Sequence, residues 1–165
     1  MANGSWPNGG RLADCATFGA RSHKSGPNSS GAVLETAAGM ESRIINERAF
    51  RFACRIVKLC ERLWSQGYAA RKIADQLFDS GTSIGANAAE SQGGQTKPDF
   101  VAKLAVARKE SWETIYWLQL AIATSIATKD EVAWELDEAQ QLKAMITAIK
   151  KGQSSPWRGG PEVQP

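Results

Sequence analysis

QLFDSGTSIGANAAESQGG, residues 76–94, is the stretch that decides the fold of this chain. Apolar residues in and just before it recur at helical spacing near one helix face, and they are Ile73, Leu77, Ile84 and Ala88. Beside that face every fourth residue is small, namely Gly81, Gly85 and Ala89. Each interior glycine costs about 1 kcal/mol of helix stability relative to alanine, so a compensating gain is needed. We expect that gain to be close packing against the next helix along the chain.

Length and composition predict a single domain. The chain has 165 residues, 42% of them hydrophobic, which is enough for one buried core. The net charge of +3 permits an acidic partner such as RNA but does not require one. Cys15, Cys54 and Cys60 have neither a disulfide nor a metal-binding pattern. With no apolar run of about 18 residues and no signal peptide, we expect a soluble, cytoplasmic protein that does not enter a membrane.

The two ends of the chain differ in composition from its middle. Residues 1–43 are rich in Gly, Pro, Ser and Asn and residues 152–165 in Gly and Pro, both without an apolar period, and we predict that both are disordered. Residues 44–151 then form the folded domain. Met40 lies at the boundary, so a downstream translation start there is a hypothesis that the mass of the native N-terminus would test. His23, the one histidine, lies in the first segment.

The middle of the chain has the pattern of four helices. Their expected ranges are about 45–66, 69–91, 96–125 and 128–151. Thr96 with Asp99, and Thr128 with Glu131, have the spacing of capping boxes at the starts of the last two. Because short loops make consecutive helices antiparallel, the sequence predicts an all-α, up-down-up-down four-helix bundle with no strand.

The first of these helices carries a row of cations along one face. We call it the basic stripe, and its members are Arg48, Arg51, Arg55, Lys58 and Arg62. It spans roughly 20 Å at 1.5 Å per residue, enough to meet several backbone phosphates, so we predict a nucleic-acid-binding face. The alternative is an ordinary solvated helix face. The first half of the last helix is acidic instead, which favours either an acidic ligand on the opposite side or head-to-tail contact between copies.

The sequence offers little for catalysis. The carboxylates of Glu90, Glu110 and Glu113 raise the question of a site for two metal ions inside the bundle. The domain lacks the histidines that such sites require. Its serines likewise have no histidine base. We therefore predict no metal, no cofactor and no catalytic residue. Instead, Glu90, Lys109, Glu110 and Glu113 are expected to pair across the contact between the second and third helices, where Asn87 also lies.

Tryptophan is unusually abundant for so small a bundle. The rings in the domain are Trp64, Trp112, Trp117 and Trp134. Tryptophan is hard to bury completely in a narrow core, so two interpretations remain open. The rings either lie at contacts between subunits or cover the ends of the core.

Two runs of sequence together resemble a known family. They are DQLFDSGTSIGANAAE at 75–90 and KPDFVAKLAVARKESWETIYWL at 97–118. The chain resembles, over about residues 45–151, the four-helix-bundle proteins encoded in intervening sequences of large-subunit ribosomal RNA genes. The resemblance implies an antiparallel bundle that assembles into a homopentameric ring, has no enzymatic activity, and uses the polar motif positions, Asn87, Glu90, Lys109, Glu110 and Glu113, structurally. A related protein, the accessory variability determinant of diversity-generating retroelements, is a basic ring that partners a reverse transcriptase and its RNA.

Three functions follow, in order of preference. The first is a non-enzymatic oligomeric bundle that binds RNA or a nucleoprotein partner, such as a reverse transcriptase, through the basic stripe. The second is a protein-interaction scaffold in which a ring of copies is the functional unit and the cations only favour solubility. The third is an enzyme, for which the sequence supplies no constellation of residues.

Overall fold

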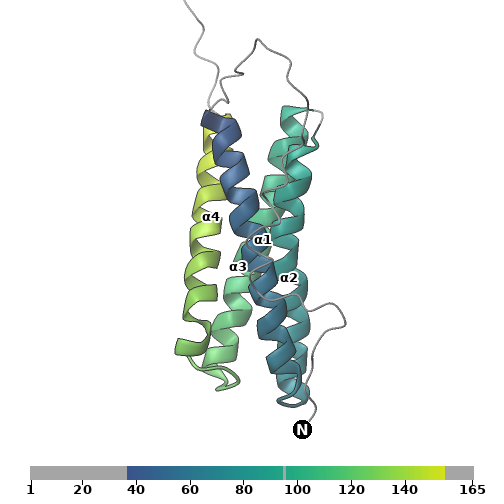
Figure 1. The fold of residues 1–165 in the computed structure, drawn as a ribbon, viewed down its shortest axis with the longest axis vertical. Coiled ribbons are helices and arrows are strands. Elements are labelled where there is room, and N and C mark those ends of the chain that lie inside the picture. The colour runs from purple at the N-terminus through teal and green to yellow at the C-terminus, as the bar shows by residue number, and fades with distance from the viewer. Residues whose placement is uncertain (1–36, 95, 155–165) are drawn as a thin grey trace, which may run out of the picture.

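The computed structural model describes residues 37–94 and 96–154, and these residues form four long α-helices and one short 3-10 helix. The elements are α1 (Ala37–Trp64), α2 (Tyr68–Gln92), α3 (Lys97–Ala123), η2 (Asp130–Val132) and α4 (Ala133–Ser154). Consecutive helices alternate in direction along one long axis, and α1 packs against both α2 and α4 (Figure 1). No strand occurs in the described ranges, so the predicted antiparallel four-helix bundle is confirmed.

The bundle extends further at both ends than its predicted bounds of 44 and 151. Helix α1 begins at Ala37, and α4 continues to Ser154. Alanine, methionine and glutamate, which are strong helix formers, surround Gly39, so a single glycine does not stop α1 there. The remainder of the two segments predicted to be disordered, 1–36 and 155–165, lies outside the described residues.

Local signals position the ends of the helices as predicted. Thr96 Oγ1 accepts a hydrogen bond from the Asp99 backbone N–H at 3.3 Å and caps α3. The second box is reciprocal: the Glu131 N–H donates to Thr128 Oγ1 at 3.3 Å, and the Thr128 N–H donates to Glu131 Oε2 at 2.7 Å. The backbone N–H and the hydroxyl of Thr128 both donate to the Glu131 carboxylate, and these two hydrogen bonds lower the pKa of that group. Gly67, with φ of 124°, turns the chain between α1 and α2.

Gly81 and Gly85 of α2 face α1, so the expectation that they pack against α3 was wrong. A Cβ atom at Gly81 would lie 2.8 Å from Ile56 Cγ2, and one at Gly85 would lie 3.2 Å from the Ala49 carbonyl oxygen. Both neighbours belong to α1. The two glycines therefore let the backbones of α1 and α2 approach closely, which is the gain that offsets their cost in helix propensity.

A continuous apolar core runs between the four helices. Its largest fully buried side chains include Phe52, Ile56, Leu77, Leu118 and Leu142. The contact between α2 and α3 adds a buried polar pair, because Thr114 Oγ1 lies 3.1 Å from Ser80 Oγ. Within these same ranges, no helix has the length and apolar composition needed to cross a membrane.

Gly81→Ala should destabilise the fold by about 1 kcal/mol. The added methyl collides with the fully buried Ile56, and overpacking of this kind costs about 1–3 kcal/mol, more than the roughly 1 kcal/mol gained in helix propensity. Gly93→Ala is the matched control, since its Cβ would lie 3.6 Å from the nearest atom and its backbone is already helical. Urea unfolding of the two variants measures the difference. A Gly81→Ala protein as stable as the parent would contradict this account of α2.

Candidate nucleic-acid interface

The basic stripe lies beside α4, and two of its arginines bind carboxylates there. We call this contact the α1–α4 seam and define it by Arg48, Arg55, Trp134, Glu135 and Glu138. Arg48 and Glu138 form a bidentate ion pair. Arg48 Nε donates to Glu138 Oε1 at 2.8 Å, and a terminal nitrogen of Arg48 donates to Glu138 Oε2 at 2.6 Å. This hydrogen-bonded pair raises the pKa of Arg48.

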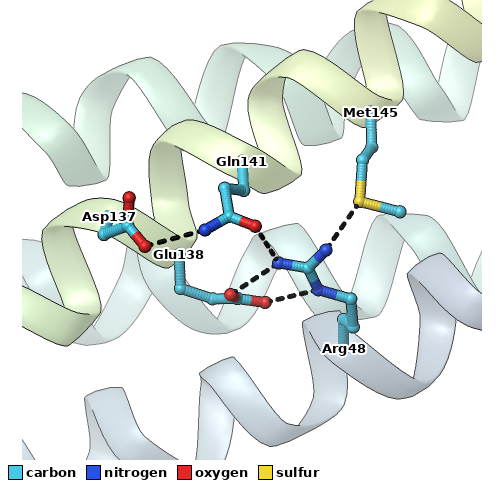
Figure 2. A network of polar contacts seen from close by, with 5 residues as sticks. All are labelled: Arg48, Asp137, Glu138, Gln141 and Met145. Atoms are coloured by element: carbon cyan, nitrogen blue, oxygen red, sulfur yellow. Dashed lines mark hydrogen bonds and ion pairs between the residues drawn. The ribbon is translucent and has the colours of Figure 1, made fainter.

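Further side chains of α4 surround the same guanidinium, as Figure 2 shows. Gln141 Oε1 accepts from Arg48 at 2.7 Å, and Met145 Sδ lies 3.2 Å from its other terminal nitrogen. Gln141 is itself oriented, because its Nε2 donates to Asp137 Oδ2 at 2.7 Å. The donors of Arg48 are therefore directed at α4, and little of this group is available to an external phosphate.

Arg55 lies two turns further along α1 and forms the second ion pair between α1 and α4. Its Nε donates to Glu135 Oε1 at 2.8 Å, and its guanidinium carbon lies 4.4 Å from the centre of the Trp134 ring. Phe52 stacks on Trp134 with a centroid distance of 6.3 Å, which ties the indole to the core. Glu135 is buried, whereas the side chain of Arg55 remains 54% exposed. Arg55 thus binds α4 while part of its guanidinium group remains exposed to solvent.

The other members of the stripe lie outward. Lys58 Nζ bonds Glu61 Oε2 at 3.1 Å on the same exposed helix surface. The side chains of Arg51 and Arg62 are exposed and, among the described residues, make no hydrogen bond or ion pair. The five cations predicted to bind nucleic acid therefore do share one face, but α4 engages Arg48 and Arg55. The acidic residues of α4 were expected on a surface opposite the basic stripe. Instead, two of them pair with its arginines and partly neutralise its charge.

The predicted polar contacts between α2 and α3 are arranged differently from expectation. Glu90 pairs with Lys103 across the two helices, and this lysine was not among the expected partners. Lys109 lies 3.8 Å from Glu110, its neighbour on α3. Asn87 Nδ2 donates to the Ser83 carbonyl at 2.9 Å within α2, and Glu113 makes no polar contact to the rest of the described chain. The short turn before α3, which brings Lys103 opposite the end of α2, was the available signal for the Glu90 partner.

The buried thiol of α1 is unsuited to nucleophilic chemistry. Burial raises the pKa of Cys60 to about 12, with smaller contributions from Asp75 and Asp79. Its Sγ donates to the Ala74 carbonyl at 3.2 Å, so the thiol acts as a small core residue. In ranges 37–94 and 96–154, no group of three or more His, Cys, Asp or Glu side chains is placed to hold a metal ion.

Comparison with known proteins assigns the fold to a family. The model of the 23S rRNA-intervening sequence protein family matches residues 41–148, which include all of α2 and α3 and most of α1 and α4. The chain belongs to this family. The resemblance identified from residues 75–90 and 97–118 is thereby confirmed.

A solved structure of a related protein is similar to this chain in fold. It is a protein of unknown function from the S23 ribosomal protein family of Bacteroides thetaiotaomicron, 32% identical to this chain, with a TM-score of 0.64. The match covers 68% of this chain and 99% of that one, so nearly the whole of that relative matches this chain. No protein with a curated description matches the chain. The α1–α4 seam lies entirely inside the family match.

Glu138→Ala should cost about 2 kcal/mol of unfolding free energy. The substitution leaves Arg48 partly buried without its carboxylate, and breaking a fully buried pair costs about 3–5 kcal/mol, which we reduce because Arg48 is 29% exposed. Glu61→Ala is the control, because its pair with Lys58 is exposed and should be worth less than about 0.5 kcal/mol. Chemical denaturation measures both. Equal stability of the two variants would show that the seam does not hold α4 in place.

Proposed function

We propose that this protein is a non-enzymatic accessory bundle that binds RNA, or an RNA-containing complex, through the exposed cations of α1. One observation carries the proposal: Arg51, Lys58 and Arg62 are all exposed along a single face of α1. They span about 16 Å at 1.5 Å per residue, with the half-exposed Arg55 between them. Such a row can contact successive phosphates of one strand.

The surroundings of this row also support an acidic ligand. The carboxylates of Glu135 and Glu138 are directed at Arg55 and Arg48, so they do not pair with Arg51. Glu61 is exposed beside Lys58, and exposed pairs of this kind are weak and easily displaced by a phosphate. The family description refers to intervening sequences of 23S rRNA, which makes RNA the first ligand class to test.

Simultaneous replacement of Arg51, Lys58 and Arg62 by Glu should abolish binding of a labelled single-stranded RNA. For the parent protein, each phosphate contact contributes about 0.7 to the slope of log affinity against log salt, so these three cations account for about 2 of that slope. Fluorescence anisotropy over a salt series measures both quantities. Arg55 is left intact, because a glutamate there would face Glu135 and damage the seam.

The control has the same net charge but reverses cations elsewhere. Lys72, Lys97 and Lys109 lie on α2 and α3, are exposed, and can be replaced together by Glu. This variant should keep most of the RNA affinity, because its α1 face is unchanged. If both triple variants lost affinity equally, binding would depend on overall charge, and the proposal for α1 would fail.

A second candidate function, self-association as a scaffold, is favoured by the outer surface of α3. Besides its buried apolar residues, α3 has large apolar side chains on its solvent-exposed surface. Trp112 and Tyr116, one turn apart, are 58% and 56% exposed, and Val106 is exposed on the same helix. Lys143 of α4 covers part of the indole of Trp112 at 3.8 Å. Exposed Trp and Tyr of this kind are typical of protein interfaces, and the family resemblance leads us to expect five copies.

Trp112→Ala with Tyr116→Ala should weaken any homo-oligomer at least about tenfold in dissociation constant, because large aromatic residues dominate interface energies. Tyr68→Ala is the control, since Tyr68 is 78% exposed but lies at the turn between α1 and α2. Light scattering and sedimentation equilibrium give the copy number and affinity. A parent protein that stays monomeric at every concentration would eliminate this candidate.

A further inference from the structure

The α1–α4 seam contains a hollow between its two ion-paired levels. It has a volume of about 200 Å³ and is lined by Arg48, Arg51, Trp134 and Glu138. Arg48 and Glu138 are bound to each other, and the ring of Trp134 is in contact with Arg55. Arg51, which lies between Arg48 and Arg55 on α1, borders the same space. Two helices thus contribute one aromatic ring, one carboxylate and two guanidinium groups to a single open site.

Arg51 differs from the arginines on either side of it. Arg48 and Arg55 each bind a carboxylate of α4, but in the described part of the chain Arg51 has no acidic partner. The planar fork of an arginine guanidinium matches the oxygens of a phosphate. The hollow is therefore bordered by an exposed cation with unused donors, which favours an anionic group in the ligand.

The walls of the hollow favour a planar, hydrogen-bonding group as well. Trp134 is held by Phe52 and Arg55, so its indole is already positioned and loses little freedom on binding. Glu138 accepts two hydrogen bonds from Arg48, but a carboxylate has about four lone-pair sites, and the others can accept N–H donors from a ligand. A phosphate joined to a flat ring with an amino edge combines both requirements. That is the chemistry of a nucleotide.

We propose that this hollow binds one nucleotide of a single RNA strand, with the phosphate on Arg51, the base against the exposed part of the Trp134 ring, and the amino edge of the base donating to Glu138. This assignment rests on the proposed RNA-binding function and adds a base preference to it. Cytosine offers an exocyclic amino donor where uracil has a carbonyl oxygen, and carboxylates accept from that amino group. The site should therefore discriminate between two pyrimidines of equal charge and similar stacking.

The test compares labelled oligocytidine and oligouridine of equal length by fluorescence anisotropy, together with cytidine monophosphate by calorimetry. The parent protein should bind oligocytidine at least about fivefold more tightly than oligouridine. Glu138→Gln should reduce that ratio toward one, because the amide places a donor where the carboxylate accepted. Arg51→Gln should weaken both oligonucleotides and keep their ratio. The Arg51 side chain is exposed and has no partner in the described fold, so this substitution should leave the protein folded. A loss of RNA affinity in this variant would then not be due to unfolding.

The outcomes separate this inference from the proposed function. Equal, salt-dependent binding of both oligonucleotides would overturn the nucleotide site and leave RNA binding by α1 standing. A ratio unchanged in a folded Glu138→Gln protein would overturn it as well. Binding of cytidine monophosphate without binding of either oligonucleotide would support the site, with a free nucleotide as its ligand, and end the RNA proposal. Absence of all three interactions would end both.

Discussion

Close approach of α1 and α2 over Gly81 and Gly85 determines how the rest of the bundle is arranged. With no Cβ at these positions, Ile56 and the Ala49 backbone of α1 sit directly against α2. That contact sets the rotation of α1 about its own axis. Successive residues of a helix are about 100° apart, so turning Ala49 and Ile56 toward α2 turns Arg48 and Arg55 toward α4. The two glycines of α2 thus decide which side of α1 faces α4 and where the cations of α1 lie.

The rotation of α1 has consequences for both stability and function. Arg48 and Arg55 reach Glu138 and Glu135, and these pairs, with Phe52 stacked on Trp134, close the bundle where α1 meets α4. Removing one partner of such a pair is costly, because the other charge is left partly buried without its counter-ion. The same arrangement leaves Arg51, Lys58 and Arg62 outward. Two cations of the basic stripe on α1 therefore bind α4, and the other three form an exposed basic surface.

Much of the architecture could be predicted from the chain because its signals are local. The apolar spacing of each helix, the capping boxes at Thr96 and Thr128, and the turn at Gly67 involve residues at most a few positions apart. The composition of the basic stripe was equally visible. Its ion pairs were not, because Arg48 and Glu138 are separated by ninety positions, and helical periodicity identifies a buried face without naming the helix that covers it. Glu90 illustrates the same limit, since its partner proved to be Lys103.

The sequence by itself determined the number of helices, their order and polarity, and the residues that each contributes to a core, because backbone hydrogen bonding and side-chain periodicity act within one segment. It also identified the need for a close neighbour at Gly81 and Gly85. Only the tertiary structure decided that this neighbour is α1, that α4 neutralises part of the basic stripe, and that Arg51 borders a hollow beside Trp134. Those outcomes depend on the relative rotation and height of whole helices, which are set by the packing of all four together.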